Sequence, residues 1–270
     1  MSALPLAGKV GLLFVALWIF LAIFGPALAP HDVGAVVSPD VFGAFSARHP
    51  LGTDYLGRDM LSRILVAARF TIGLALVAAL AASVTGTTLA LVAATAGGWV
   101  DEVMSRLMDA FISIPSKMLA LVMVAAFGSS VPLLILTAAM SYTPGAYRIA
   151  RSLAVNVKTL EYVQAARARG ERLPYIARVE ILPNMVNPML ADFGLRFVFV
   201  VLLLSGMSFL GLGVQPPNAD LGSLVRENIS GLFEGAPAVV VPAIAIATLT
   251  VSVNLLIDAI SGRATRVAES

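Results

Sequence analysis

Long stretches without a charged residue dominate the hydrophobic pattern of this chain. A helix needs about 20 apolar residues to cross the hydrocarbon layer of a membrane, which is roughly 30 Å thick. Three charge-free stretches meet that requirement, and each predicts a membrane-spanning helix. They are Val10–Leu28, Ile72–Ala96 and Gly235–Ile257.

A fourth charge-free stretch, Met118–Tyr147, is too long for a single crossing. Gly128 and Pro132 interrupt it, because glycine tolerates a turn and proline cannot donate a hydrogen bond to the helical ladder. The interruption therefore predicts two spans on either side of it. With one further span, the pattern predicts six helices, of which the remaining three lie near Arg106–Phe127, Val131–Ala150 and Pro188–Leu212.

The composition indicates that lipid is the solvent for these helices. Of 270 residues, 59% are hydrophobic and only 13% are charged, whereas a soluble domain carries roughly 25% charged residues. Charge this sparse cannot cover a water-soluble surface of this size, so we expect an all-α, polytopic membrane protein. The first apolar run is longer than the core of a signal peptide, which is about 7–15 residues, and this predicts a retained first span at about residues 10–30.

The distribution of charge predicts an orientation. Six crossings put both termini on one side of the membrane. If that side is the cytoplasm, most Lys and Arg residues lie inside, as is usual for membrane proteins, and the basic segment Arg148–Arg178 contributes most. The net charge of +2 is too small to indicate a nucleic-acid partner, and the absence of cysteine excludes disulfides and thiolate metal sites.

The expected inner loop, about residues 151–187, is too charged to be a span. It predicts two short helices, around Thr159–Arg169 and Leu173–Leu182, which meet at Gly170. A solvated connector is the alternative reading of such a loop. Against it, apolar residues recur at helical spacing and give each helix a face that needs a partner; they are Leu160, Val163, Ala166, Ile176 and Val179.

Four segments spread over nearly the whole chain carry a resemblance to a known family. They are His49-Pro50-Leu51-Gly52-Thr53-Asp54 with Leu56-Gly57-Arg58-Asp59; Gln164-Ala165-Ala166 followed by Gly170 and Ile181-Leu182-Pro183; the run from Ser208 to Pro217; and Asn254-Leu255-Leu256 followed by Asp258. The second segment resembles the EAA loop of ABC-importer permeases. Together the four resemble the oligopeptide/dipeptide/nickel branch, on the shorter of its two paired permeases.

This resemblance implies the type I ABC-importer permease fold. Residues 1–270 would form one transmembrane domain, with the first span, core spans over about residues 70–260 and a coupling loop at about 151–187. The resemblance implies a subunit without catalytic residues or a cofactor of its own. With a second, homologous permease it would form a pathway for peptides or a related small solute in a bacterial or archaeal plasma (inner) membrane. Two cytoplasmic ATP-binding subunits would hold ATP and Mg²⁺, and an extracytoplasmic solute-binding protein would deliver the solute.

The resemblance also assigns ATPase coupling to the inner loop, whose first helix would dock in a groove of an ATP-binding subunit. Gly170 permits a reversal after that helix, and the pair Ala165-Ala166 permits close approach of another protein. Gln164 stands where the family usually has Glu, so any ion pair made by that Glu is either lost or becomes a neutral hydrogen bond. The expected coupling residues are Gln164, Ala165, Ala166, Arg167, Gly170, Ile181, Leu182 and Pro183.

Polar residues within the later spans are candidates for a pathway or gate. Isolated charges in lipid cost roughly 2.5–3.5 kcal/mol on insertion scales, so they should pair or face a wet interior. Asp192 and Arg196 stand four residues apart, which favours a structural ion pair over a gate. Serines in a span often pack against a neighbouring helix instead of lining a pathway. The candidates are Asp192, Arg196, Ser205, Ser208, Asn254 and Asp258.

The outer loop, about residues 31–69, also raises the question of a metal site, because His49 lies five residues from Asp54. We favour a structural role for these residues. Thr53 or Asp54 is expected to cap the helix that enters the second span, and Asp59 is expected to pair with Arg63 at i,i+4 spacing. No metal site is therefore expected. The loop is also a candidate contact for the partner permease or the binding protein.

Other functional classes fit the sequence less well. A self-contained secondary transporter or channel would need an acidic or ion-binding site near mid-span, whereas the acids here lie near the ends of the spans. An exporter permease would not show a loop like that at 151–187. An enzyme has no visible machinery, because the sequence contains no GxxxxGK[ST], HExxH or GxSxG pattern.

Overall fold

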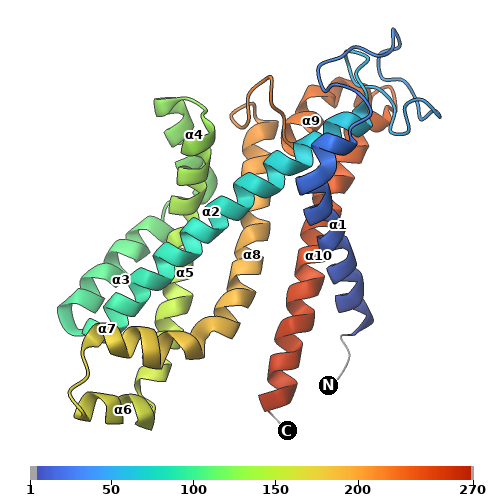
Figure 1. Ribbon diagram of the computed structural model, residues 1–270. Helices are drawn as coiled ribbons and strands as arrows, with labels where there is room; N and C mark the ends of the chain where they lie inside the picture. Colours follow the sequence, from blue (N-terminus) through green and yellow to red (C-terminus); the bar gives the residue numbers. More distant parts are fainter. Residues whose placement is uncertain (1–4, 269–270) are drawn as a thin grey trace.

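Long helices form the body of the protein, as the charge-free stretches predict (Figure 1). The structure is a computed structural model that describes residues 5–268, with side chains up to residue 261. The α-helices are α1 (Leu6–Leu28), α2 (Met60–Ala96), α3 (Gly98–Ile112), α4 (Ser116–Phe127), α5 (Val131–Lys158), α6 (Glu161–Ala168), α7 (Leu173–Tyr175), α8 (Leu182–Phe209), α9 (Leu221–Glu227) and α10 (Pro237–Ala268). A π-helical turn, η1 (Ile176–Ile181), joins α7 to α8, and a 3-10 turn, η2 (Ile229–Leu232), follows α9.

Four helical segments within residues 5–268 are long and apolar enough to cross a membrane: α1, α2, the segment Leu173–Phe209, and Pro237–Ser261 of α10. The number rises to five if the bent pair of α3 and α4 forms one span. These segments confirm an all-helical, polytopic membrane protein. The expected count of six crossings stays a prediction. It requires α5 as a further span, and α5 carries Arg148, Arg151 and Lys158 in its second half.

The expected third span, Arg106–Phe127, is wrong as a continuous helix. Helix α3 begins earlier, at Gly98, and its axis differs by 80° from that of α4. Pro115 lies at the break and precedes the first residue of α4. Proline lacks the N–H that would extend α3 and pushes the residue before it toward extended geometry, so the helix stops there. The break expected at Gly128 is confirmed, because α4 ends at Phe127.

Helices α2 and α5 cross at the centre of the fold, and small residues bring them together. A Cβ atom on Gly86 of α2 would lie 2.5 Å from the Cβ atom of Ala146 and 2.8 Å from the carbonyl oxygen of Thr143, both on α5. In membranes such close backbone approach replaces the hydrophobic effect as a source of helix association. The crossing therefore depends on the absence of a side chain at position 86.

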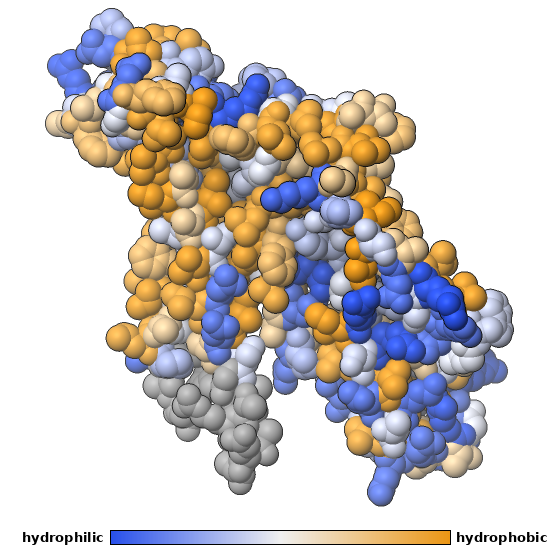
Figure 2. Space-filling model, turned by 180° about the vertical axis from the view of Figure 1, so that it is seen from behind, coloured by the Kyte–Doolittle hydropathy of each residue, from blue (hydrophilic) through white to orange (hydrophobic). Residues whose placement is uncertain are grey.

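The surface of the molecule divides into an apolar belt and a polar end. Figure 2 shows hydrophobic side chains over the middle of the molecule and hydrophilic side chains gathered at the end that carries α6 and α7. Many large apolar residues of α1 are exposed, among them Leu13 at 68% and Ile23 at 58%. In water such exposure over a whole helix would be costly, so this face of the molecule fits lipid.

Candidate functional site

The segment that the sequence assigns to coupling lies at the polar end of the molecule, where α6 and α7 are found (Figure 1). We call residues 161–183 the coupling segment. Its first expected helix is confirmed, because α6 lies within Thr159–Arg169. The second expected helix is wrong as a separate element, because α7 and η1 continue directly into α8, which begins at Leu182 and not near Pro188. Pro183 is the second residue of α8 and follows directly after the π-helical turn η1.

Gly170 ends α6 and reverses the chain, as the sequence predicts. Its φ angle of +81° lies in the left-handed region that glycine adopts without steric cost. The N–H of Gly170 donates to the carbonyl oxygen of Arg167 at 2.9 Å, and the N–H of Glu171 donates to that of Ala166 at 3.2 Å. This pair of bonds is the Schellman motif, which satisfies the last carbonyl groups of a helix. A Cβ atom at Gly170 would meet no atom within 4 Å, so the reversal leaves open space beside it.

The apolar face of α6 has its partner within the chain. Val163 and Ala166 are wholly buried and belong to a cluster that includes Ile176 and Ile181 of η1. The sequence expectation of a buried face is confirmed for these residues. It is wrong for Leu160 and Val179, which are 46% and 50% exposed. The cluster fixes α6 against the start of α8, so the two elements form one packed unit.

The opposite face of α6 is open. Gln164 and Ala165 are exposed, so the Ala165-Ala166 pair is divided between the outer and the packed face of the helix. The side-chain amide of Gln164 donates to the carbonyl oxygen of Lys158 at 3.3 Å. Arg167 is half-buried, and its Nε and Nη2 atoms have no hydrogen-bond partner among the described residues. Leu182 is half-buried, and Gly170 and Pro183 are exposed.

Three large exposed residues near this face were not singled out from the sequence. Tyr162, Leu173 and Tyr175 are 40%, 47% and 40% exposed. Aromatic and leucine side chains at an exposed surface are typical of protein interfaces. Their helical spacing alone does not distinguish an outward from an inward face, so the sequence carried no signal for them.

The expected pair of Asp192 and Arg196 on α8 is present. The Nη2 atom of Arg196 lies 2.7 Å from Oδ2 of Asp192, and both side chains are 7% exposed. The Nη1 atom of Arg196 also donates to the carbonyl oxygen of Tyr142 on α5 at 2.6 Å. Gly145 of α5 makes room for this guanidinium, because a Cβ atom there would lie 3.0 Å from Nη1. The pair therefore joins α8 to α5.

The two candidate serines of α8 face α9. Ser205 is 8% exposed and Ser208 is 2% exposed, and the hydroxyl of Ser208 donates to a carboxylate oxygen of Asp220 at 2.5 Å. Asp220 caps α9, because its Oδ1 atom accepts a hydrogen bond from the N–H of Ser223 at 2.7 Å. Burial raises the pKa of the Asp220 carboxyl group, and the hydrogen bonds from Ser208 and Ser223 oppose that rise. No pattern in the sequence indicates that this acid is buried.

The remaining candidates, Asn254 and Asp258, lie on α10 and are half-buried and exposed, respectively. Among the described side chains, no hydrogen bond or ion pair connects them to Asp192 or Arg196. The structure thus brings together Asp192 with Arg196, and places both serines against α9, but it does not join the six candidates into one site.

The start of α2 corrects two expectations about the outer loop. Helix α2 begins at Met60, so the loop does not extend to residue 69. Asp59, and not Thr53 or Asp54, caps the helix, because its carboxylate accepts a hydrogen bond from the N–H of Ser62 at 2.9 Å. A carboxylate turned toward the first turn of its own helix cannot reach the next turn, and the expected pair of Asp59 with Arg63 is therefore wrong.

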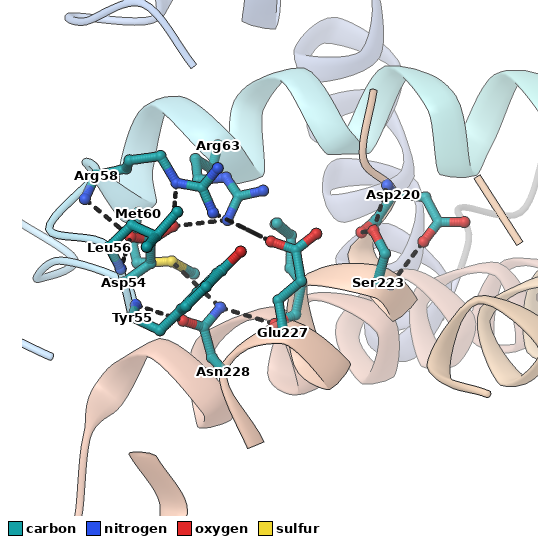
Figure 3. A network of polar contacts seen from close by, with 11 residues as sticks. Asp54, Tyr55, Leu56, Arg58, Met60, Arg63, Asp220, Ser223, Glu227 and Asn228 are labelled. Atoms are coloured by element: carbon teal, nitrogen blue, oxygen red, sulfur yellow. Dashed lines mark hydrogen bonds and ion pairs between the residues drawn. The ribbon is translucent and has the colours of Figure 1, made fainter. Parts of the chain in front are cut away.

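Arg63 instead takes part in a buried charge network that joins the loop, α2 and α9 (Figure 3). Its Nη1 atom lies 2.7 Å from Asp54 and 2.8 Å from Glu227. Arg58 binds the same two carboxylates, at 2.6 Å and 3.2 Å. Asn228 accepts a hydrogen bond from the N–H of Tyr55 at 3.1 Å. The outer loop is therefore a fixed part of the fold and not a loose connector.

Together the fold and this segment define a class: a polytopic helical membrane subunit with a packed, polar helical segment between two of its long helices. Residues 86–266, more than half of the chain, match the family described as "Binding-protein-dependent transport system inner membrane component". The chain belongs to this family. The expected membership in the ABC-importer permeases is thereby confirmed.

Relatives with an assigned transport role match nearly all of the chain. The glutathione transport system permease protein GsiD of Pectobacterium atrosepticum is 32% identical over 247 residues, which are 91% of this chain and 82% of that protein. The dipeptide transport system permease protein DppC of Alkalihalophilus pseudofirmus is 30% identical over 249 residues, 92% of this chain and 82% of that protein. A crystal structure of an amino acid ABC transporter matches with a TM-score of 0.52 and 18% identity, over 76% of this chain and 93% of that chain, which supports the fold alone.

Family membership fixes the general role of the chain. It is a multi-pass, inner-membrane permease subunit of an ABC importer, and it is not itself an ATPase. The role calls for no cofactor in this chain. A binding-protein-dependent system of this kind also implies an ATPase, a paired permease and a solute-binding protein.

Proposed function

We propose that this chain and a second, homologous permease enclose the pathway by which short peptides are imported, driven by two cytoplasmic ATP-binding subunits. The solute class rests on the relatives, whose names specify glutathione and dipeptides. The coupling segment carries the rest of the proposal. One face of α6 is buried against η1 and the other face, with Gln164 and Ala165, is open to a partner.

The connection of the coupling segment to α8 supports this role. Because α7 and η1 continue into α8, and Val163 and Ala166 hold α6 against them, α6 and the start of α8 can move together. A displacement of α6 by an ATP-binding subunit would then tilt a membrane-spanning helix. Rigid-body motion of packed elements is a common way to convert closure of one domain into opening of another.

We further propose that residues 1–270 act as one transmembrane domain with both termini on the cytoplasmic side. The last turns of α10 lie at the same end of the molecule as α6 and α7 in Figure 1, and that end carries the basic segment Arg148–Arg178. The buried pair of Asp192 and Arg196 has a structural role in this proposal. It holds α8 against α5 and does not act as a gate of the pathway.

Two glycines allow a matched test of coupling. Gly170 and Gly128 have φ angles of +81° and +82°, and a Cβ atom on either would meet no atom within 4 Å. An arginine strains the backbone at both positions, and more strongly at Gly128, whose ψ of 175° lies in a region nearly restricted to glycine. Gly128→Arg is therefore a demanding control, and only Gly170→Arg places bulk beside α6. The assay is ATP hydrolysis by the complete importer in nanodiscs, stimulated by the solute-loaded binding protein.

We expect Gly170→Arg to abolish the stimulated hydrolysis while the permease still inserts, and Gly128→Arg to retain it. Unchanged coupling in Gly170→Arg would contradict the assignment of the coupling segment. Equal losses in both variants would attribute the effect to backbone strain. Solute uptake without the ATP-binding subunits would instead indicate a self-contained transporter.

A further inference from the structure

The chain contains two histidines, and the fold brings both to the same carboxylate. His31 follows the end of α1, His49 lies in the outer loop, and Asp59 is the N-cap of α2. The centroids of the two imidazole rings are 5.7 Å apart. Sequence spacing had paired His49 with Asp54, but Asp54 is bound by Arg58 and is not part of this group. The cluster lies at the end of the molecule opposite to α6.

The three side chains have the spacing of metal ligands. The Nδ1 atom of His49 lies 3.3 Å from Oδ1 of Asp59, and Nδ1 of His31 lies 3.7 Å from Oδ2. One ligand atom from each residue lies within 4.8 Å of the other two. Zinc binds nitrogen and oxygen at about 2.0–2.2 Å in a tetrahedron, which separates neighbouring ligand atoms by about 3.4 Å. The two histidine–aspartate distances, each to a different oxygen of the carboxylate, are close to that separation.

The hydrogen bonds around the cluster leave capacity for an ion. Ser62 donates both its N–H and its hydroxyl to Oδ2 of Asp59, at 2.9 Å and 2.7 Å, which fixes the orientation of the carboxylate. Among the described residues, Oδ1 has only the contact with His49. The Nδ1 atom of His31 is buried and has no hydrogen-bond partner there. An imidazole nitrogen that is withdrawn from water and unpaired loses free energy unless a ligand binds it.

Access to the cluster is one-sided. The side chain of Asp59 is 1% exposed and that of His49 is 15% exposed, whereas that of His31 is 36% exposed. An ion would therefore enter past His31 and keep one coordination position for water. Sites with three protein ligands and an open fourth position are common for zinc. The serine contacts to Asp59 correspond to the outer hydrogen bonds that orient metal ligands.

We propose that His31, His49 and Asp59 form a binding site for a divalent transition-metal ion of the zinc type. Two imidazoles and one carboxylate favour Zn²⁺, Co²⁺ or Ni²⁺ over Mg²⁺ and Ca²⁺, which prefer oxygen ligands alone. The ion connects the end of α1 to the start of α2 and stabilises the outer loop by binding to the folded state. This site is independent of the proposed coupling segment, and the proposal departs from the sequence-based expectation that the chain has no metal site.

The first experiment uses the full-length chain, purified in detergent without a polyhistidine tag, and Co²⁺ as a spectroscopic probe. The expected result is uptake of one Co²⁺ per chain, with visible absorption bands of a low-coordinate ion that disappear when Zn²⁺ is added. Absence of stoichiometric uptake by this protein, or a spectrum identical to that of Co²⁺ in buffer, would overturn the proposal whatever the variants do.

Two variants and a control then locate the ion. His31→Gln and His49→Gln each remove one ligand and are expected to lose Co²⁺ binding and the rise in melting temperature that Zn²⁺ produces in the unaltered chain. Asp40→Asn removes an exposed carboxylate of the same loop and is expected to bind Co²⁺ normally. If both histidine variants bind as the unaltered chain does, the ion lies elsewhere and the proposal is wrong.

Discussion

The carboxylate of Asp54, which is wholly buried, lies 2.7 Å from the Nη1 atom of Arg63. The pair joins the outer loop to α2, and Arg63 extends the contact to Glu227 at the end of α9. Three segments of the chain thus share one set of charges. Because the charges of Asp54 and Arg63 have been removed from water, the network tolerates the loss of both charges of this pair better than the loss of one.

Asp54→Asn should destabilise the protein by about 3–5 kcal/mol, because it leaves two guanidinium groups with only Glu227 as a charged partner. The measurement is thermal unfolding in detergent, followed by tryptophan fluorescence, since Trp18 is 7% exposed and reports on packing of α1. Asp40→Asn, an exposed change in the same loop, should leave the melting temperature within error. Similar melting temperatures for the two variants would show that the buried network contributes nothing.

The charge pairs indicate where sequence spacing predicts contacts and where it does not. Asp192 and Arg196 both lie inside α8, so residues four apart meet on one face and the prediction is correct. Asp59 precedes the first turn of α2, with a ψ angle of 116°, and its side chain binds the backbone of that turn. Arg63 therefore does not pair with Asp59 and instead forms an ion pair with Asp54. The i,i+4 rule requires that both residues lie within the helix, and the sequence does not define the first residue of α2 to that accuracy.

Local features of the coupling segment were predictable from the sequence, whereas the long-range contacts of the outer loop were not. Apolar spacing and Gly170 identified α6, its buried face and its reversal, because these depend on neighbours in the chain. The partners of Arg63 and Tyr55 were not predictable, because Glu227 at the end of α9 and Asn228 directly after it come more than 160 residues later. No local pattern distinguishes these two residues from other polar residues of a loop.

Reversing the pair on α8 separates a structural tie from a gate. Asp192→Asn alone should cost about 3–5 kcal/mol of stability, because it leaves Arg196 buried without its carboxylate. The double variant Asp192→Arg/Arg196→Asp should recover only part of this loss. Arg196 also donates to the carbonyl oxygen of Tyr142, and an aspartate at position 196 would face that oxygen with a second acceptor.

The measurements for this pair are the melting temperature of each variant and peptide uptake by the complete importer. A structural tie predicts that stability and uptake recover together in the double variant. If stability recovers while uptake remains absent, the pair acts in the pathway. Complete recovery of stability would mean that the hydrogen bond to Tyr142 contributes little.

The buried carboxyl group of Asp220 should make stability depend on pH. Burial raises its pKa above that of the unfolded chain, which is about 3.9. A folded state that holds its proton more tightly than the unfolded state loses stability as pH rises through this interval. Asn at this position keeps the cap of α9 and can still bond Ser208, but it does not titrate.

The stability of Asp220→Asn, expressed relative to that of the unaltered chain, should therefore increase from pH 4 to pH 8. The check is a series of melting temperatures across this range, with Asp40→Asn as an exposed control whose difference should stay constant. Parallel curves for Asp220→Asn and the unaltered chain would mean that the pKa of Asp220 is the same in the folded and unfolded states.

Two glycines of α2 provide a matched test of the crossing with α5. Replacement of a helical glycine by alanine stabilises the helix by roughly 0.5–1 kcal/mol when there is room for the methyl group. A Cβ atom on Gly73 would meet no atom within 4 Å, so Gly73→Ala should gain this amount. A Cβ atom on Gly86 would lie 2.5 Å from Ala146 and would force the two helices apart.

Gly86→Ala should therefore destabilise the chain, since overpacking typically costs about 1–3 kcal/mol and exceeds the gain in the helix. Melting temperatures of the two variants in detergent should shift in opposite directions from that of the unaltered chain. The same direction for both would show that α2 and α5 do not approach as closely as the backbone contact at Thr143 indicates. Because helix association in lipid depends on such contacts, the opposite shifts should persist when the variants are measured in nanodiscs.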